Sequence, residues 1–181
     1  MENMRSSKLS LFLMELIVAI MFFSLSAAVC IRLFAAAHVL AEKTGNLESA
    51  IMWSQNLSEA FTAKKGDLEK IAALYPDSYI ASDSDDAGSL IIIFDKDWEP
   101  TDRDLADASY EVILSAATKD ASEVYSDITD YDVELAGKAV TGEIAIIDLR
   151  GGKEVLSVIP EDKDKIFYSN SIDVYIGKED E

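Results

Sequence analysis

The chain has 181 residues and a formal net charge of −18 at pH 7, a length that suits one modest domain together with a membrane anchor. Residues 1–10 carry +1 and residues 11–34 are neutral, so the rest of the chain carries −19. A domain with this charge repels nucleic acid phosphates, which disfavours direct nucleic acid binding. Because Cys30 is the single cysteine, no intramolecular disulfide can form and the domain must be stabilised by its apolar core.

The first predicted element is an apolar helix over residues 11–31, in which Glu15 is the one charged residue. A helix of this length rises about 32 Å, which is enough to cross the hydrocarbon core of a bilayer. Arg5 and Lys8 precede it and the acidic region follows it, so the positive-inside rule places the N-terminus in the cytoplasm and the C-terminal domain outside. The sequence therefore predicts a single-pass protein of the cell membrane, in contact with membrane lipid.

Two other interpretations of this segment are disfavoured. A cleaved secretory signal peptide would have a shorter apolar region than the one found here. A lipoprotein signal ending at Cys30 would need a small residue before the cysteine, and Val29 is larger than that. A retained anchor fits best. Within it, a carboxylate such as Glu15 is costly and is usually functional or paired, although it could also extend to the cytoplasmic interface or stay protonated.

Beyond the membrane the helix is predicted to continue as an amphipathic stalk over residues 32–64. Gly45 is a weak point, because glycine costs about 1 kcal/mol relative to alanine inside a helix, and Gly66 is expected to end it. We expect this half to pack its apolar stripe against a sheet, and the alternative is a juxtamembrane dimerisation helix. The stripe falls at helical spacing, with Ala50 and Ser54 between its members: Leu40, Leu47, Ile51, Leu57 and Phe61.

The region over residues 65–181 is predicted to be an α+β domain, in which the long helix packs on an antiparallel sheet. It begins with a short helix over residues 67–75, capped by Asp67 and stopped by Pro76, and an acidic loop over residues 77–88. The segment from Arg150 to Lys153 contains Gly151 and Gly152, a pattern typical of a tight hairpin turn. Apolar runs and alternating patterns predict strands over residues 90–94, 109–118, 139–149, 154–159 and 166–176.

No catalytic motif with a recognisable spacing is present, so the sequence predicts a protein that is not an enzyme and needs no cofactor. The single histidine, His38, follows the anchor and has no evident partner. Trp53 and Trp98 are expected to be packing residues. Two aspartate groups are interpreted as solvated loops because neither matches the spacing of a calcium loop, although calcium binding stays open; they are Asp83, Asp85 and Asp86 before Gly88, and Asp127, Asp130 and Asp132.

The N-terminal segment resembles type IV pilins and type II secretion pseudopilins, bacterial proteins with a short basic leader, a prepilin peptidase site and an apolar helix with glutamate at its fifth position. In this chain the leader would be residues 1–10, and cleavage would fall between Ser10 and Leu11, which makes Glu15 the fifth mature residue. The resemblance covers residues 5–64. The family usually has glycine before the cut and phenylalanine after it, whereas this chain has Ser10 and Leu11.

The resemblance implies a structural role and a set of partners. It implies a pilin-like subunit, a minor pilin or a pseudopilin, of a type IV pilus, type II secretion or competence-type filament. Glu15 would neutralise the new amino group of Leu11 on a neighbouring subunit, because opposite charges attract strongly in a low dielectric. The implied partners are other pilin-like subunits, the inner-membrane assembly machinery and prepilin peptidase. The alternative is a membrane-anchored extracytoplasmic binding module whose N-terminus is not cleaved.

Overall fold

The computed structural model describes residues 2–84, 87–101, 107–126, 135–151 and 154–177. Within it the chain divides into two compact units, Met1–Asn46 and Leu47–Glu181. The first contains most of a long helix, and the second contains the end of that helix and an antiparallel sheet of five strands. The α+β class expected from the sequence is therefore confirmed.

Helix α1 (Glu2–Ala63) contains the predicted apolar segment. In the first unit its side chains from Ser10 to Gly45 are exposed. Among the described residues, α1 is the one helix whose length and apolar composition would allow it to cross a membrane. The predicted helix over residues 11–64 is confirmed, and α1 also includes most of the predicted leader.

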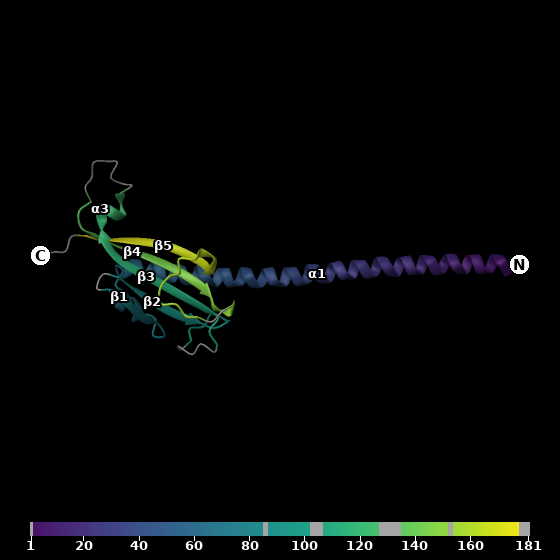
Figure 1. The fold of residues 1–181 in the computed structure, drawn as a ribbon, viewed down its shortest axis with the longest axis horizontal. Coiled ribbons are helices and arrows are strands. Elements are labelled where there is room, and N and C mark those ends of the chain that lie inside the picture. The colour runs from purple at the N-terminus through teal and green to yellow at the C-terminus, as the bar shows by residue number, and fades with distance from the viewer. Residues whose placement is uncertain (1, 85–86, 102–106, 127–134, 152–153, 178–181) are drawn as a thin grey trace. The chain divides into compact units, whose positions relative to one another are not determined.

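The second unit is built on a sheet whose strands follow one another in chain order, each antiparallel to its neighbours (Figure 1). The central strand β3 pairs with β4 along its whole length and with β2 over most of it, and β1 and β5 form the two edges. The strands are β1 (Tyr79–Ser84), β2 (Ala87–Phe94), β3 (Tyr110–Asp120), β4 (Lys138–Asp148) and β5 (Ile166–Gly177).

Short helices connect the strands. The predicted helix over residues 67–75 is confirmed in its first part as α2 (Leu68–Ala72), which ends before Pro76. The Asp67 side chain accepts a 3.0 Å hydrogen bond from the backbone N–H of Lys70, as expected for its cap. This cap satisfies one of the free N–H groups at the start of the helix. The remaining short elements are α3 (Ala121–Val124), which lies in a region where we predicted no element, and the 3-10 helices η2 (Leu149–Gly151) and η3 (Lys163–Lys165).

The acidic loop predicted over residues 77–88 is wrong, because most of it is strand. Tyr79 pairs with Ile91 and Ser82 pairs with Gly88, so β1 and the start of β2 form a hairpin. The acidic composition concealed a short alternation in which Tyr79 and Ala81 pack against the core while Ile80 is exposed. Backbone pairing with β2 satisfies the polar groups of this segment despite its low intrinsic strand propensity.

The hairpin predicted around Gly151 and Gly152 is also wrong. Residues 154–159 form no strand, and β4 pairs instead with β5, from Lys138↔Gly177 to Ile147↔Ile166. Gly152 and Lys153 lie outside the described residues, while Gly151 ends η2. The physical reason is that β5 offers a longer alternating partner, whereas the apolar residues of the 154–159 segment are used to cover a face of the sheet.

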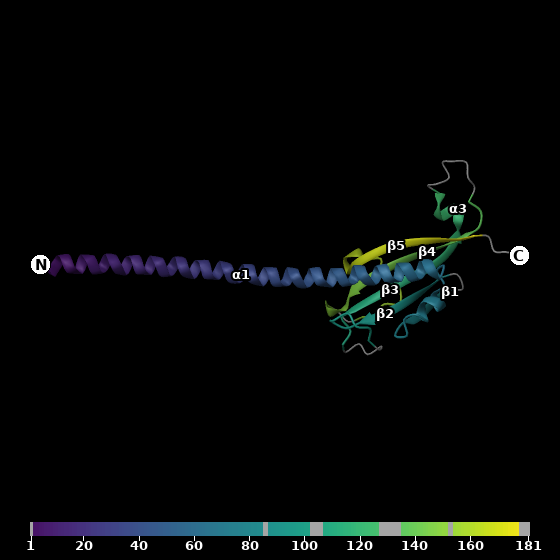
Figure 2. The same ribbon diagram turned by 180° about the vertical axis from the view of Figure 1, so that it is seen from behind.

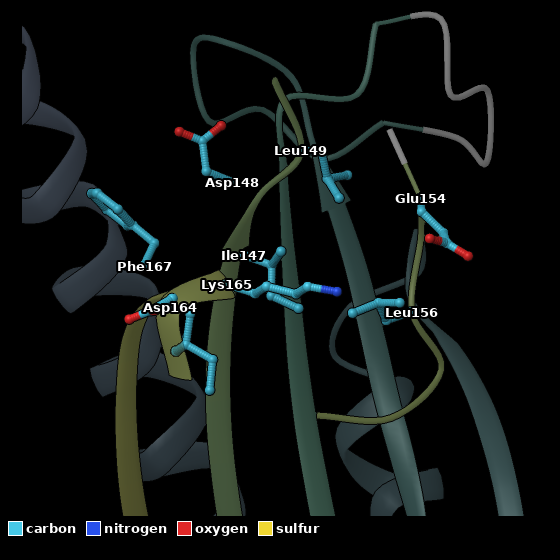
Figure 3. Close-up of a pocket in the computed structure, with 9 residues that line it drawn as sticks. Ile147, Asp148, Leu149, Glu154, Leu156, Asp164, Lys165 and Phe167 are labelled. Carbon is cyan, nitrogen blue, oxygen red and sulfur yellow. The ribbon is translucent and has the colours of Figure 1, made fainter. Parts of the chain in front are cut away.

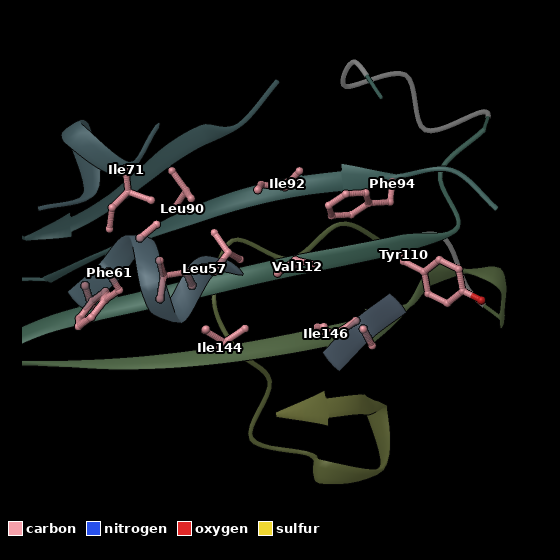
Figure 4. Packing of buried hydrophobic residues seen from close by; sticks show 14 of the residues in the cluster. Leu57, Phe61, Ile71, Leu90, Ile92, Phe94, Tyr110, Val112, Ile144 and Ile146 are labelled. Carbon is pink, nitrogen blue, oxygen red and sulfur yellow. The ribbon is translucent and has the colours of Figure 1, made fainter. Parts of the chain in front are cut away.

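The C-terminal part of α1 covers one face of the sheet, opposite to the face that residues 154–159 cover (Figure 2). Leu57 and Phe61 are fully buried there, and Ala50 and Ser54 let the helix approach closely because their side chains are small. The exposed fractions of Leu40 and Leu47 are 65% and 40%, so the predicted stripe is correct only in its C-terminal half. Figure 4 shows the side chains that the sheet contributes to this core: Leu90, Ile92, Phe94, Tyr110, Val112, Ile144 and Ile146.

Helix α1 ends where Gly66 was expected to stop it. The Gly66 N–H donates a 2.9 Å bond to the Phe61 carbonyl oxygen, and its φ of +76° places it in the left-handed region. A side chain could not be accommodated there, because a Cβ would lie 2.5 Å from Cγ1 of Val140. The glycine therefore lets the chain turn away from the helix directly against β4.

We predict that a fragment beginning at Glu42 is soluble and monomeric, since the second unit contains its own core and the apolar segment is removed. Its strongly negative charge keeps molecules apart. Sedimentation velocity checks this result. Aggregation at low salt, where charge repulsion is strongest, would show that the fold is not self-contained.

We predict that Gly142→Ala lowers the unfolding free energy of this fragment by about 1–3 kcal/mol. A Cβ at Gly142 would lie 2.8 Å from Cζ of the buried Phe61 ring, so the helix or the strand must shift. Chemical unfolding followed by tryptophan fluorescence measures the change.

Phe61→Leu serves as the matched second variant, because it removes the ring atoms that the methyl group added by Gly142→Ala would meet. The combined variant should then lose less stability than the sum of the single changes. Simple additivity would contradict the proposed contact between the helix and β4.

Candidate functional site

The predicted processing and assembly residues all lie on α1. Ser10, Leu11 and Glu15 are exposed in the first unit, and 69% of the Leu11 surface is accessible. The Ser10–Leu11 peptide bond lies within the helix. The structure therefore places the proposed cut and the carboxylate on one continuous element.

Leu11 and Glu15 are four residues apart, and such residues lie one above the other on the same helix face. A cut before Leu11 would create an amino group one turn from the Glu15 carboxylate. On an isolated helix these two groups would be neighbours. In an assembly, the carboxylate could instead meet the amino group of an adjacent subunit.

Other sequence candidates are not brought together. His38 and Cys30 are exposed on α1. Asp85, Asp127, Asp130 and Asp132 lie outside the described residues, as does Asp86. In the part of the chain that the structure describes, no group of three or more His, Cys, Asp or Glu side chains has the geometry of a metal site.

Trp53 and Trp98 are packing residues, as the sequence indicated. The ring centroids of Trp53 and Phe94 lie 4.6 Å apart, and Trp98 is stacked on Tyr110 with ring centroids 4.2 Å apart. Trp98 has a φ of +64°, a strained value for a bulky residue. This conformation turns the indole into the core beside Tyr110, and the burial offsets the strain.

Arg150 lies next to this aromatic group. Its guanidinium is 4.9 Å from the centre of the Tyr110 ring and donates bonds of 2.9 and 2.7 Å to the two carboxylate oxygens of Asp148. The side-chain bond from Arg150 lowers the pKa of Asp148 below its ordinary value. Asp148 therefore stays ionised, and its negative charge is balanced by the bidentate pair with Arg150.

A buried carboxylate, which the sequence did not identify, lies on the second face of the sheet. Glu111 is fully buried in β3, where its paired neighbours are Ile93 on β2 and Ile147 on β4. Its two oxygens accept bonds of 3.1 and 3.0 Å from the backbone N–H of Leu156. We call residues 154–159 the strap, because Val155, Leu156 and Ile159 pack over this face.

Burial raises the pKa of Glu111 from 4.5 to about 7, and the hydrogen bond from Leu156 partly opposes this shift. An ionised carboxylate among isoleucines is penalised because the apolar surroundings replace its water. The protonated form is therefore favoured in the folded protein over a pH range in which an exposed glutamate would be charged.

A pocket of about 570 Å³ lies beside the strap (Figure 3). Ile147 of β4 lies at its floor, with Leu156 of the strap on one side and Lys165 on the other. Phe167 also borders the pocket, but its ring packs with Tyr110 in the core on the face covered by α1. Such a volume falls within the range of small-molecule sites. The remaining lining residues are Asp148, Leu149, Glu154, Asp164 and Ile166.

The sequence contains one signal that indicates the buried carboxylate. The apolar run over residues 90–94 indicated a strand buried on both faces, and its neighbour β3 must share those faces. Glu111 alternates with Tyr110 and Val112, so it points to the second face rather than to solvent. The strap that covers this face cannot be recognised from the sequence, because the apolar residues of the 154–159 segment also fit a strand.

We predict that Glu111 makes the fragment beginning at Glu42 less stable as the pH rises from about 4.5 to 7. Its folded pKa of about 7 exceeds the unfolded value of 4.5, so the folded state binds more protons in this range. The favourable contribution is complete below the unfolded pKa and is lost as the pH passes through the folded pKa. The loss should be on the order of 2 kcal/mol.

Glu111→Gln should remove this part of the pH dependence, because the amide does not titrate. Glu143→Gln is the matched control, since Glu143 lies exposed on the same face of the sheet. Urea unfolding at several pH values measures the difference between the variants. An identical pH profile for Glu111→Gln and the unmodified fragment would refute the buried, protonated state.

The chain was compared with protein-family models, with curated proteins and with solved structures. None of the three comparisons found a match. The function is therefore inferred from the residues and the geometry described above.

Proposed function

We propose that this protein is a prepilin-like structural subunit, a minor pilin or pseudopilin, of a type IV pilus, type II secretion or competence-type filament. The observation that carries the proposal is a single helix with two different halves. Residues 11–31 are apolar except for Glu15, and the C-terminal part of α1 is built into the core of an antiparallel domain.

The apolar half supports a role as both anchor and assembly element. Its large side chains are exposed around the helix, including Phe12, Phe22 and Leu25 at about 60% each. Such a surface is stable in lipid or against other apolar helices, because most of its side chains have no polar group to leave unsatisfied. Residues 1–10 would remain cytoplasmic and the acidic domain would lie outside, following the positive-inside rule.

Glu15 supports assembly with other subunits. A lone carboxylate in an apolar segment favours any arrangement that supplies a positive partner. Cleavage by a prepilin peptidase between Ser10 and Leu11 would create that partner on every subunit. The attraction between Glu15 and a neighbouring Leu11 amino group would then set the axial position of adjacent helices.

An anchored binding module is the second candidate, and the pocket beside the strap favours it. This interpretation needs the same anchor but no cut at Ser10. The two candidates therefore differ in the mature N-terminus. Mass spectrometry of the protein purified from membranes distinguishes them, because a subunit begins at Leu11 and a binding module retains the leader.

We predict that Glu15→Leu leaves the membrane level of the protein unchanged or higher, since a costly carboxylate is removed. Cross-linking to neighbouring pilin-like subunits should fall several-fold, because the amino group of Leu11 loses its counter-charge. Quantitative blotting and site-specific cross-linking in cells that express the assembly system provide the two measurements.

Ser24→Ala is the matched control. Ser24 also lies in the apolar segment, but its hydroxyl donates a 2.8 Å bond to the Ile20 carbonyl of its own helix. This variant should cross-link normally. Normal cross-linking of Glu15→Leu would exclude the assembly role and favour a carboxylate that extends to the cytoplasmic interface.

A further inference from the structure

Among the described residues that line the pocket between the strap and β5, Lys165 is the one cationic side chain. Lys165 is directed across the pocket toward Leu156 (Figure 3). Within the described ranges, its ammonium group forms no hydrogen bond or ion pair with another side chain. An ammonium with three free donors at the side of an apolar surface is suited to a ligand that supplies oxygen acceptors.

None of the described carboxylates that line the pocket forms an ion pair with Lys165. Asp148 is held by Arg150 at 2.7 Å. Glu154 lies on the strap with its carboxylate turned away from Lys165, and the Asp164 carboxylate is directed to the opposite side (Figure 3). These groups keep the rim polar without occupying the position opposite the ammonium.

The floor and walls fix the other half of the ligand. Leu156 and Ile166, both half-buried, present aliphatic surface in the same pocket as the ammonium, above the buried side chain of Ile147. A ligand with a branched or linear hydrocarbon body would cover this surface and gain from leaving water. The volume of about 570 Å³ accommodates a small molecule or one terminal residue of a peptide.

We propose that this pocket binds a small monocarboxylate with an apolar body, the carboxylate bonded to Lys165 and the body lying on Ile147 and Leu156. The same chemistry occurs in a free branched-chain acid and in the C-terminal residue of an apolar peptide. Neither source depends on whether the protein is cleaved or assembled, so the pocket can be tested separately from the proposed function.

The experiment uses the full chain in lipid nanodiscs with isotope-labelled isoleucine and leucine methyl groups. Isocaproate represents the free acid, and N-acetyl-leucine represents the peptide terminus. Isocaproamide and isohexylamine have similar bodies but lack the carboxylate. We expect both acids to shift the methyl resonances of Ile147 and Leu156 and to saturate with dissociation constants in the millimolar range.

The two acids distinguish the source of the ligand. Tighter binding of N-acetyl-leucine supports a peptide terminus, because only its amide group adds polar contacts. Tighter binding of isocaproate supports a free acid. The amide and the amine should bind at least about tenfold more weakly than isocaproate, since neither supplies an anionic acceptor.

Lys165→Met tests the role of the ammonium while keeping a long apolar side chain. It should weaken isocaproate binding about tenfold or more. Lys163→Met is the matched control, because Lys163 lies in the same short helix η3 but does not line the pocket. This variant should bind isocaproate with unchanged affinity. Unchanged affinity in Lys165→Met, equal binding of the amide, or no methyl shift with either acid would overturn the proposal.

Discussion

The structure depends on the contact between the C-terminal part of α1 and one face of the sheet. A meander of five strands has an apolar face that must be covered, and here the cover is supplied by the same helix that contains the apolar segment. Leu57 and Phe61 fill the space, while Ala50 and Ser54 keep the backbones close. The absence of a side chain at Gly142 leaves room for the Phe61 ring. The domain core is therefore incomplete without the C-terminal end of α1.

The second face of the sheet is covered differently. No helix covers it among the described residues, and an irregular strap with three apolar side chains takes that place. A segment without regular structure leaves backbone N–H groups to be satisfied, and Glu111 accepts the bond from Leu156. The same carboxylate carries a desolvation penalty that raises its pKa. One residue thus satisfies a backbone N–H of the strap and has a raised pKa because of the same burial.

The two sheet faces are covered by different segments, α1 on one and the strap on the other, and this explains why the candidate functional features are separated. The apolar half of α1 is long and apolar enough to cross a membrane, and it contains the single carboxylate on which the proposed assembly depends. The pocket arises within the second unit, where β5 leaves β4 and the strap lies over Glu111 on β3. The proposed assembly segment and the proposed ligand site are therefore independent, because the two features share no residues.

The sequence by itself determined the long helix, its apolar first half, the position of Glu15, the α2 cap and four of the five strands, β2 to β5. These features depend on local periodicity and on residues with strong conformational preferences, such as Asp67 and Gly66. The roles of Ser10, Leu11 and Glu15 remain proposals, since their partners are not part of this chain. Tertiary structure decided the β1–β2 hairpin, the pairing of β4 with β5 and the conversion of residues 154–159 into a strap. It also created the Glu111 environment and the Lys165 pocket. These features arise from segments distant in the chain that compete for the same strand edge or sheet face, and a local pattern contains no information about which competitor packs better.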